Sequence, residues 1–156
     1  MSDAILGFGT RFYLQATAGA AALTKVAEVT SVTPPNEQVA EVEVTHYESP
    51  GRTREFIAGL NDAGDMSFEI NWVPGNATDS LIATAKADGL VRTMRIVTPA
   101  IPGTPGSPGQ QFTFPGFVRG FERGLPIDDK LTATITVRVA GAVVQAVAAA
   151  NPTVIS

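Results

Sequence analysis

The chain of 156 residues contains no cysteine and only one histidine, His46. The absence of cysteine excludes disulfides, thiolate zinc sites, iron–sulfur clusters and cysteine nucleophiles. A single histidine leaves few options for acid–base catalysis or metal binding. Charged residues make up only 17% of the chain, and a formal net charge of −4 argues against a nucleic-acid binder with a basic surface. These scarcities point away from an enzyme.

Long apolar runs are also missing. No stretch reaches the roughly 18 to 20 uninterrupted apolar residues that a membrane-spanning helix needs. The N-terminus lacks the basic segment and the sustained apolar stretch of a signal peptide, so we expect a soluble protein made without export. Fifteen glycines and eleven prolines, with only 7% aromatic residues, favour short strands and turns over long helices.

Alternation of apolar and polar residues with a period of two is the dominant pattern. Three segments show it cleanly, at residues 38–46, 66–72 and 131–139. Each predicts an antiparallel strand with one face on a core and one polar face. Weaker strands are expected at residues 11–16, 25–32, 91–97 and 111–122. The sequence therefore predicts an all-β domain over residues 1–139, an antiparallel β-sandwich or barrel.

One short helix is expected at residues 78–88. Asn76 or Thr78 can cap its start, and Gly89 stands where a helix-terminating glycine belongs. Its apolar face comprises Leu81, Ile82 and Ala85. We expect this helix to cover an open end or edge of the sheet.

Two long stretches predict no strand, at residues 47–65 and 98–110. The first is longer than most loops of compact domains and carries apolar residues among its charges, which is typical of a functional loop. The second is rich in proline and glycine and predicts a mobile surface loop.

The C-terminal segment, residues 140–156, is apolar with almost no charge. Exposed on a monomer, such a segment would favour aggregation. It either packs back on its own domain or docks on a neighbouring subunit. We favour docking on a neighbour, because the segment lacks the alternation of a half-buried strand.

No constellation of residues amounts to an active site. His46 has no Gly-x-Ser-x-Gly motif to serve and is interpreted as a structural or rim histidine. The segment 61–65, NDAGD, lacks the downstream glutamate of a calcium loop. The sequence predicts no catalytic residue, no metal and no cofactor.

Charge is distributed unevenly along the chain. Residues 28–48 contain five carboxylates and no lysine or arginine: Glu28, Glu37, Glu41, Glu43 and Glu48. Arginines come later, as Arg52 and Arg54, Arg92 and Arg95, and Arg119 and Arg123. Either this is an ordinary solvated surface, or an acidic sheet pairs with arginines of another subunit.

Several segments, in order along the chain, resemble the major tail tube proteins of long-tailed (siphovirus-type) bacteriophages, the lambda-like tail tube family. They are GFGT with RFYL at residues 7–14, VTSVTPP at 29–35 before a strand ending VTH at 44–46, REFIAGLNDAG at 54–64, and LPIDDKL at 125–131 before TATITV. The resemblance implies a tail-tube fold: a mainly antiparallel β-sandwich or barrel with one short helix, an extended loop and terminal arms.

The family resemblance also implies a function. The chain would be a structural virion protein that polymerises as stacked hexameric rings into the tail tube, a conduit for DNA ejection into the host. Its partners would be itself, the tape-measure, tail-tip and tail-terminator proteins, and DNA in transient, non-specific passage, without membrane binding. It would be made in the cytoplasm of the host bacterium and function in the virion.

Roles for individual residues follow from the same resemblance. The loop at 47–65 would contact the adjacent ring through Arg52, Arg54, Phe56, Ile57, Leu60 and Asp62. Acidic side chains in the lumen, which would repel DNA phosphates, would be Glu41 and Glu43. The apolar C-terminal arm would contact a neighbouring subunit through Val143, Val144, Val147, Val154 and Ile155.

Two alternatives remain. The first is the tube protein of a related contractile injection or secretion system, which a neighbouring sheath gene would favour. The second is a carbohydrate-binding β-sandwich module, which would need aromatic side chains exposed on a polar face. Phe68 and Trp72 instead lie in the inward row of their strand.

Overall fold

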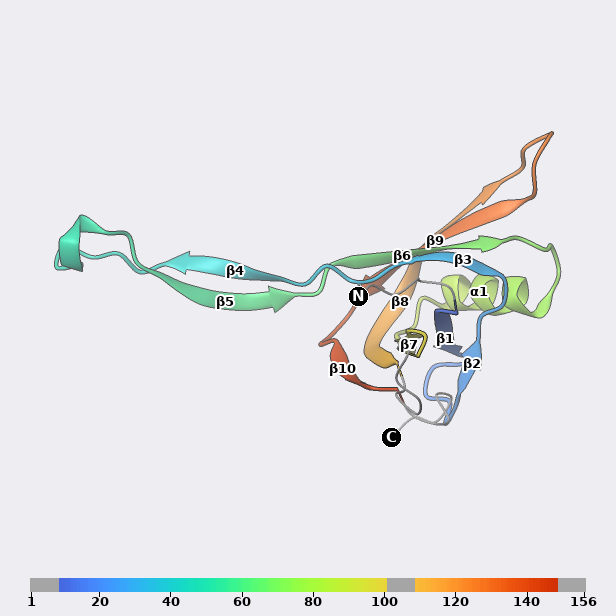
Figure 1. Ribbon diagram of the computed structural model, residues 1–156, viewed down its shortest axis with the longest axis horizontal. Helices are drawn as coiled ribbons and strands as arrows, with labels where there is room; N and C mark the ends of the chain where they lie inside the picture. Colours follow the sequence, from blue (N-terminus) through green and yellow to red (C-terminus); the bar gives the residue numbers. More distant parts are fainter. Residues whose placement is uncertain (1–8, 101–108, 149–156) are drawn as a thin grey trace, which may run out of the picture.

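The computed structural model describes residues 9–100 and 109–148 and shows a β-sandwich body with a long projecting arm (Figure 1). Its elements in chain order are β1 (Arg11–Gln15), β2 (Leu23–Lys25), β3 (Val29–Thr33), β4 (Gln38–Glu43), the 3-10 turn η1 (Pro50–Arg52), β5 (Phe56–Asp62), β6 (Asp65–Asn71), α1 (Ala77–Asp88), β7 (Arg92–Val97), β8 (Gln110–Gly124), β9 (Thr132–Val139) and β10 (Val144–Val147). The predicted all-β class is confirmed.

The strands of the body form one antiparallel sheet in the order β2-β1-β7-β8-β9-β6-β3, with β10 added on β8. The long strand β8 runs through both layers of the sandwich (Figure 1). Its first part, up to Gly116, pairs with β7 and β10, and its second part pairs with β9. The register shifts between Val118 and Gly120, where the strand passes along the second layer. A bulge of this kind bends a strand and increases its twist.

The core lies between the two layers and confirms two of the three clean alternations. In β6, Met66, Phe68 and Ile70 are buried, as the inward row predicts. In β9 the buried row is Ala133, Ile135, Val137 and Val139. Phe12 of β1 meets Phe68 across the sandwich with ring centroids 4.5 Å apart. These contacts join the layers through one apolar cluster.

The helix α1 begins and ends where the sequence predicts. Asn76 is the N-cap, and its side chain accepts a hydrogen bond of 2.8 Å from the backbone N–H of Asp79. Gly89 terminates the helix with a φ of 62°, a left-handed conformation that favours glycine. Ile82 and Ala85 are buried, and the helix packs against β8. It therefore closes one side of the sandwich.

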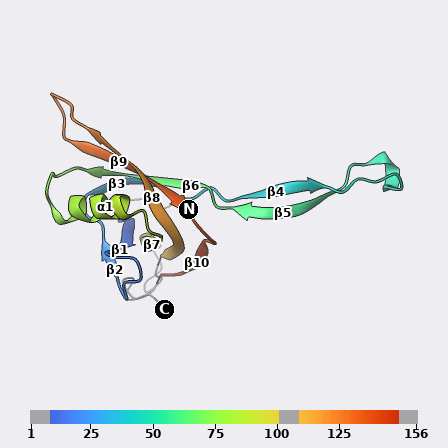
Figure 2. The same ribbon diagram turned by 180° about the vertical axis from the view of Figure 1, so that it is seen from behind.

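The third clean alternation, over residues 38–46, does not belong to the body. Residues 38–43 form β4, whose side chains are all exposed, and β4 pairs only with β5 in a separate two-stranded ladder. The expectation of a core-facing strand there is wrong, and so is the expectation that 47–65 contains no strand, because Phe56–Asp62 is β5. Together they form the arm, defined here as residues 38–62 (Figures 1 and 2).

The C-terminal segment returns to its own domain as far as residue 148. Residues of β10 pair antiparallel with the start of β8, and Ala148 packs against Tyr13, Leu23 and Val97. This is the alternative that the sequence analysis did not favour. Its pattern is missed because β10 is only four residues long and its side chains are exposed. Residues 149–156, and 101–108 of the predicted surface loop, lie outside the described residues.

Candidate functional site

The arm is the part of this chain that is hardest to account for in an isolated subunit. Among the described residues, half of the exposed large apolar side chains lie on it: Val39, Val42, Val44, Tyr47, Phe56, Ile57 and Leu60. Leu60 is 88% exposed and Phe56 51%. A lone two-stranded hairpin is marginally stable in water. An apolar hairpin that extends away from its own core is suited to contact another surface.

The two faces of the arm differ in chemistry. Directly opposite residues share a face of an antiparallel pair, and Val42 lies opposite Ile57 on one face. On the other face Glu41 lies opposite Ala58, and Glu43 opposite Phe56. The arm therefore presents one aliphatic face and one face that mixes carboxylates with an aromatic ring.

Gly59 eases the close packing of the arm's strands. A Cβ at this position would lie 3.1 Å from the carbonyl oxygen of Ala40 and 3.2 Å from Cγ2 of Val42. The register shifts next to it, between Val39 and Glu41, so β5 carries an extra residue there. The bulge increases the twist of the arm, and the extra residue interrupts the strict alternation of β5 side chains between the two faces.

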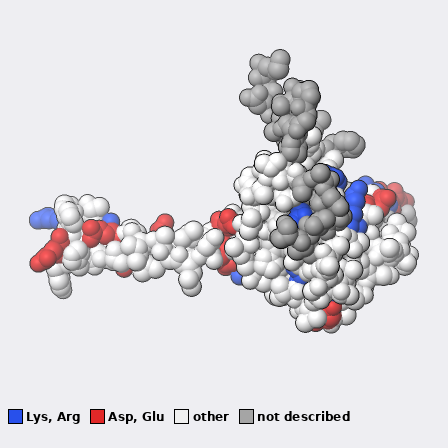
Figure 3. All heavy atoms as spheres, turned by 90° about the horizontal axis from the view of Figure 1, so that it is seen from below, with Lys and Arg blue, Asp and Glu red and all other residues white. Residues whose placement is uncertain are grey.

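The tip of the arm holds a polar cluster. Ser49 Oγ lies 2.9 Å from His46 Nδ1 and donates a hydrogen bond of 2.6 Å to Glu55 Oε2. The same ring nitrogen faces both partners, which is not the arrangement of a catalytic triad, where Ser and the acid bind opposite nitrogens. Arg52 has a φ of 57°, an uncommon conformation for a residue with a side chain. The cluster shapes a tight turn and displays charge at the far end of the arm (Figure 3).

Ion pairs fix the base of the arm. Nη2 of Arg138 donates to both carboxylate oxygens of Asp62, at 3.0 and 3.1 Å, and its Nη1 lies 3.5 Å from Asp65 Oδ1. Arg119 donates to the other oxygen of Asp65 at 2.9 Å. The backbone N–H of Gly64 and the Arg138 guanidinium together lower the pKa of Asp62. The pair with Asp62 in turn raises the pKa of Arg138. One guanidinium thus joins the last residue of β5 to the first residue of β6.

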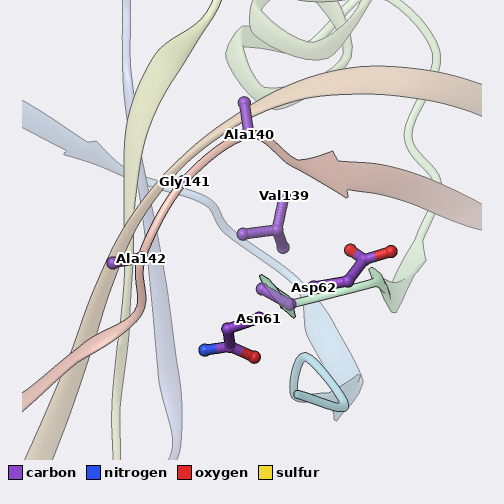
Figure 4. Close-up of a pocket in the computed structure, with 7 residues that line it drawn as sticks. Asn61, Asp62, Val139, Ala140, Gly141 and Ala142 are labelled. Carbon is purple, nitrogen blue, oxygen red and sulfur yellow. The ribbon is translucent and has the colours of Figure 1, made fainter. Parts of the chain in front are cut away.

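A hollow of about 360 Å³ opens beside this base (Figure 4). Asn61 and Asp62 line it from the end of β5, and residues 139–142 line it from the end of β9 and the segment that follows. The backbone N–H of Val139 donates to the carbonyl of Gly64 at 3.2 Å across the junction. The hollow is shallow and lined by small side chains, so it offers room for a neighbouring chain rather than a reaction centre.

The structure brings two sets of predicted residues onto one element. The predicted ring-contact residues Arg52, Arg54, Phe56, Ile57, Leu60 and Asp62 all lie on the arm, and so do the predicted lumen residues Glu41 and Glu43. Glu43 lies 4.0 Å from Arg54. A strand over residues 38–46 in the core sheet, as the alternation predicts, would have kept these two sets apart.

In the C-terminal arm the predicted contact residues differ in burial. Val143 packs against the core, whereas Val144 and Val147 of β10 are 59% and 61% exposed. Contact of these two with another subunit stays a prediction. Val154 and Ile155 lie outside the described residues.

Sequence reasoning missed Arg138, the residue that joins arm and body. One signal was available: in the outward row of β9 three threonines are followed by a single charged residue, Arg138. A single charged residue in a row of threonines is a candidate for an ion pair with a carboxylate on a neighbouring segment. Its partners Asp62 and Asp65 cannot be assigned from the sequence alone, because the assignment depends on the pairing of β6 with β9, which places Asp65 opposite Arg138.

The described residues contain neither a cluster of metal-binding side chains nor a helix that could span a membrane. Over residues 9–100 and 109–148 no three His, Asp or Glu side chains gather in an arrangement that could hold a metal ion. In the same part of the chain, no helix has the length and apolar character needed to cross a bilayer.

Solved structures with the same fold come from tubular assemblies. The tail of an empty gene transfer agent particle, refined with C6 symmetry, contains a chain with 17% identity and a TM-score of 0.68, covering 90% of this chain and 98% of its own. The SPP1 tail tube gives 14% identity and a TM-score of 0.65, covering 92% and 80%.

A sheath–tube complex of the PVC extracellular contractile injection system, in its extended state, contains a chain with 11% identity and a TM-score of 0.65, covering 92% of both chains. No curated protein matches the chain by sequence. At these identities the likeness establishes the fold.

The family itself is established by sequence. The profile described as "Lambda phage tail tube protein, TTP" matches residues 10–146, which include every described strand except the last residue of β10. The match spans the sandwich, the arm and the helix together. The chain belongs to the lambda phage tail tube protein family.

Proposed function

We propose that this chain assembles as six-membered rings that stack into the tail tube of a phage, through which DNA passes into the host. Membership of the tail tube family carries the proposal. The C6 symmetry of the gene transfer agent tail supports the ring size, because a similar subunit fold favours a similar ring. The protein acts by assembly and not by catalysis.

The open edges of one sheet layer support ring formation. Within the described residues, β3 pairs only with β6, and the part of β8 after Gly116 pairs only with β9. The layer β3-β6-β9-β8 therefore has an unpaired edge on each side. Six copies placed edge to edge would pair these strands and close a barrel, which removes the two exposed edges of this layer.

The arm supports stacking. It is the single observation that most requires a partner, because its apolar residues are exposed far from their own core (Figure 2). In a stack of rings, the arm of one copy reaches a copy in the next ring. Phe56, Ile57 and Leu60 would supply the apolar contact, and Arg52 and Arg54 would pair with carboxylates of the neighbour.

Further partners follow from this place in a tail. A tube of defined length calls for a tape-measure protein inside it and for terminator and tip proteins at its ends. DNA would pass without sequence-specific contact. We also propose synthesis in the cytoplasm of the host bacterium and incorporation into the virion, and we infer no membrane-binding role for this chain.

Electron microscopy and sedimentation of the purified full chain at high concentration test the proposal. We expect rings and tubes. A matched control deletes the arm: residues 39–61 are replaced by Asn-Gly, because Gln38 and Asp62 face each other in the ladder and a two-residue turn can join them. The armless variant is expected to fold and to form no stacked tube. A full chain that stays monomeric at all concentrations contradicts the proposal.

A second candidate, the tube of a contractile injection system, shares this fold. The chain from the PVC sheath–tube complex has a TM-score of 0.65, equal to that from the SPP1 tail tube. The family match favours the phage tube. A sheath gene beside this one, or a sheath copurifying with the tube, would favour the second candidate.

A further inference from the structure

We propose that Arg138 sets the direction in which the arm leaves the body, because its guanidinium holds Asp62 of the arm and Asp65 of the body at once. The inference deepens the proposed function, since the arm's direction would decide whether it meets the next ring. The direction itself is a property of a single subunit. It can therefore be measured without any assembly.

The junction needs such a tie because backbone pairing is interrupted there. The ladder of β3 with β6 ends at Thr33 opposite Ser67, and the ladder of β4 with β5 begins at Gln38 opposite Asp62. Residues 34 and 35 between them are both proline and have no N–H to donate. The arm thus continues the β3–β6 hairpin across a gap in the ladder, and side chains at the gap decide the angle.

Gly64 allows the two chain segments of the junction to approach closely. It adopts a φ of 70°, and a Cβ there would lie 3.1 Å from the carbonyl oxygen of Asn36. Its carbonyl accepts the hydrogen bond from Val139, which ties the backbone of the junction at one point. This bond and the buried side chain of Ala63 hold the junction to the body, and the two hydrogen bonds from Arg138 to Asp62 add a contact to the arm itself.

The geometry of the guanidinium suits this task. Arg138 lies directly opposite Asp65 in the ladder of β9 with β6, so its stem is anchored in the body. Both hydrogen bonds to Asp62 come from one terminal nitrogen, so a single anchored point of the guanidinium holds the two carboxylate oxygens. Arg119 holds Asp65 from the other side and does not touch the arm. Arg138 is therefore a positioning residue, and Arg119 is its natural control.

Both side chains of the Arg138–Asp62 pair are partly exposed to solvent. The side chain of Asp62 is 63% exposed and that of Arg138 38%. Ion pairs in such surroundings are solvated and contribute little to the free energy of unfolding. Loss of the pair is therefore expected to leave the free energy of unfolding nearly unchanged, and the direction of the arm is the property to measure.

Pulsed EPR distances between two spin labels measure that angle directly. The chain has no cysteine, so the substitutions Glu48→Cys at the tip and Glu69→Cys on β6 give two labelling sites without background. We expect a narrow distance distribution for the otherwise native chain, at a concentration where it is monomeric. Arg138→Gln is expected to broaden the distribution at least twofold, and Arg119→Gln to leave it unchanged.

Asp62→Asn provides a second, gentler variant. Its side-chain oxygen can still accept the bond from the N–H of Gly64, so it removes the ion pair and keeps the local turn. We expect the same broadening as with Arg138→Gln. Arg138→Lys keeps a positive charge opposite Asp65 and beside Asp62, and is expected to leave the distribution narrower than Arg138→Gln does.

The outcomes separate this inference from the proposed function. If Arg138→Gln and Asp62→Asn both keep a distribution as narrow as the native one, the inference is wrong, whatever the tubes do. If they broaden it and tube formation also falls, while Arg138→Lys retains more of both, both stand. If they broaden it and tubes form normally, Arg138 sets the direction but the arm is not the contact between rings.

Discussion

The indole Nε1 of Trp72 donates a hydrogen bond of 2.9 Å to Oδ1 of Asp79, joining the end of β6 to the first turn of α1. The second oxygen of Asp79 accepts a bond of 3.0 Å from the N–H of Gly75 in the intervening turn. The guanidinium of Arg123 lies 5.3 Å from the centre of the Trp72 ring and 4.1 Å from that of Phe121. A single carboxylate thus holds the helix, the turn and the tryptophan together.

Asp79→Asn is therefore expected to lower the free energy of unfolding by about 1 kcal/mol, since a neutral amide replaces a carboxylate that accepts two bonds. The hydrogen bond from Trp72 is the main cause that lowers the pKa of Asp79 from its ordinary value of 3.8. Its stabilising contribution is complete above pH 3.8 and is lost as pH falls through the lower pKa of the folded state. Urea unfolding across this range should show a flatter acid slope for Asp79→Asn than for the native chain. Equal slopes would contradict the assignment.

Arg92 is the most buried charged side chain among the described residues, with 1% exposure. Its Nη1 donates to the carbonyls of Gln15 and Ala16, and its Nη2 to the carboxylate of Asp88 at the end of α1. Arg92→Met would leave these acceptors without their donor, and we expect a loss of about 3 kcal/mol in the free energy of unfolding. Arg119→Met, at a side chain 59% exposed, is the control and should change it by less than about 0.5 kcal/mol. If urea unfolding gives similar losses of free energy for the two variants, the buried hydrogen bonds of Arg92 contribute little to stability.

Phe56→Ser with Ile57→Ser tests the arm as a contact. Both side chains are more than half exposed, so the free energy of unfolding of the monomer should change by less than about 0.5 kcal/mol. The concentration needed for tube formation should rise at least about tenfold, which corresponds to about 1.4 kcal/mol of lost contact per subunit. Ile127→Ser makes the same kind of change at another exposed turn. An unchanged threshold in the double variant, or an equal rise with Ile127→Ser, would remove the special role of the arm.

Glu41→Lys with Glu43→Lys tests the predicted lumen. If these side chains face the passing DNA, lysines would attract its phosphates and slow ejection while tubes still form. Glu41→Gln with Glu43→Gln removes the charge without reversing it and should have a smaller effect. Ejection rates from phage carrying each variant, compared with tube yield, provide the measurement. Loss of tubes with a normal ejection rate in the remaining particles would place the two glutamates in a subunit contact instead.

The strands and the helix of the body could be predicted because their own residues decide them. The rows of β6 and β9 alternate strictly, and their apolar members are long enough to fill a core. Asn76 and Gly89 mark the ends of α1 by local chemistry that needs no tertiary contact. In contrast, β10 is a short exposed strand whose position depends on the free edge of β8, so no local pattern predicts it.

The arm shows where periodicity stops being informative. Ala40, Val42 and Val44 alternate as well as any row in the body, yet the described residues of their own chain leave all three exposed. Alternation indicates that one face of a strand is shielded from water. It does not indicate whether the same chain or another chain provides the shielding. The contact at the base of the arm could not be predicted from the sequence either. Asp62 and Arg138 are 76 positions apart and meet only after the sheet has formed.

The way β5 runs into β6 has a mechanical consequence. Ala63 and Gly64 alone separate them, and β6 is bonded on both sides, to β3 and to β9. A pull on the tip of the arm therefore runs along β6 and loads its two ladders in shear, so that many hydrogen bonds share the force at once. A tube built from such subunits would carry axial tension through the middle of each sheet and would resist stretching more strongly than peeling.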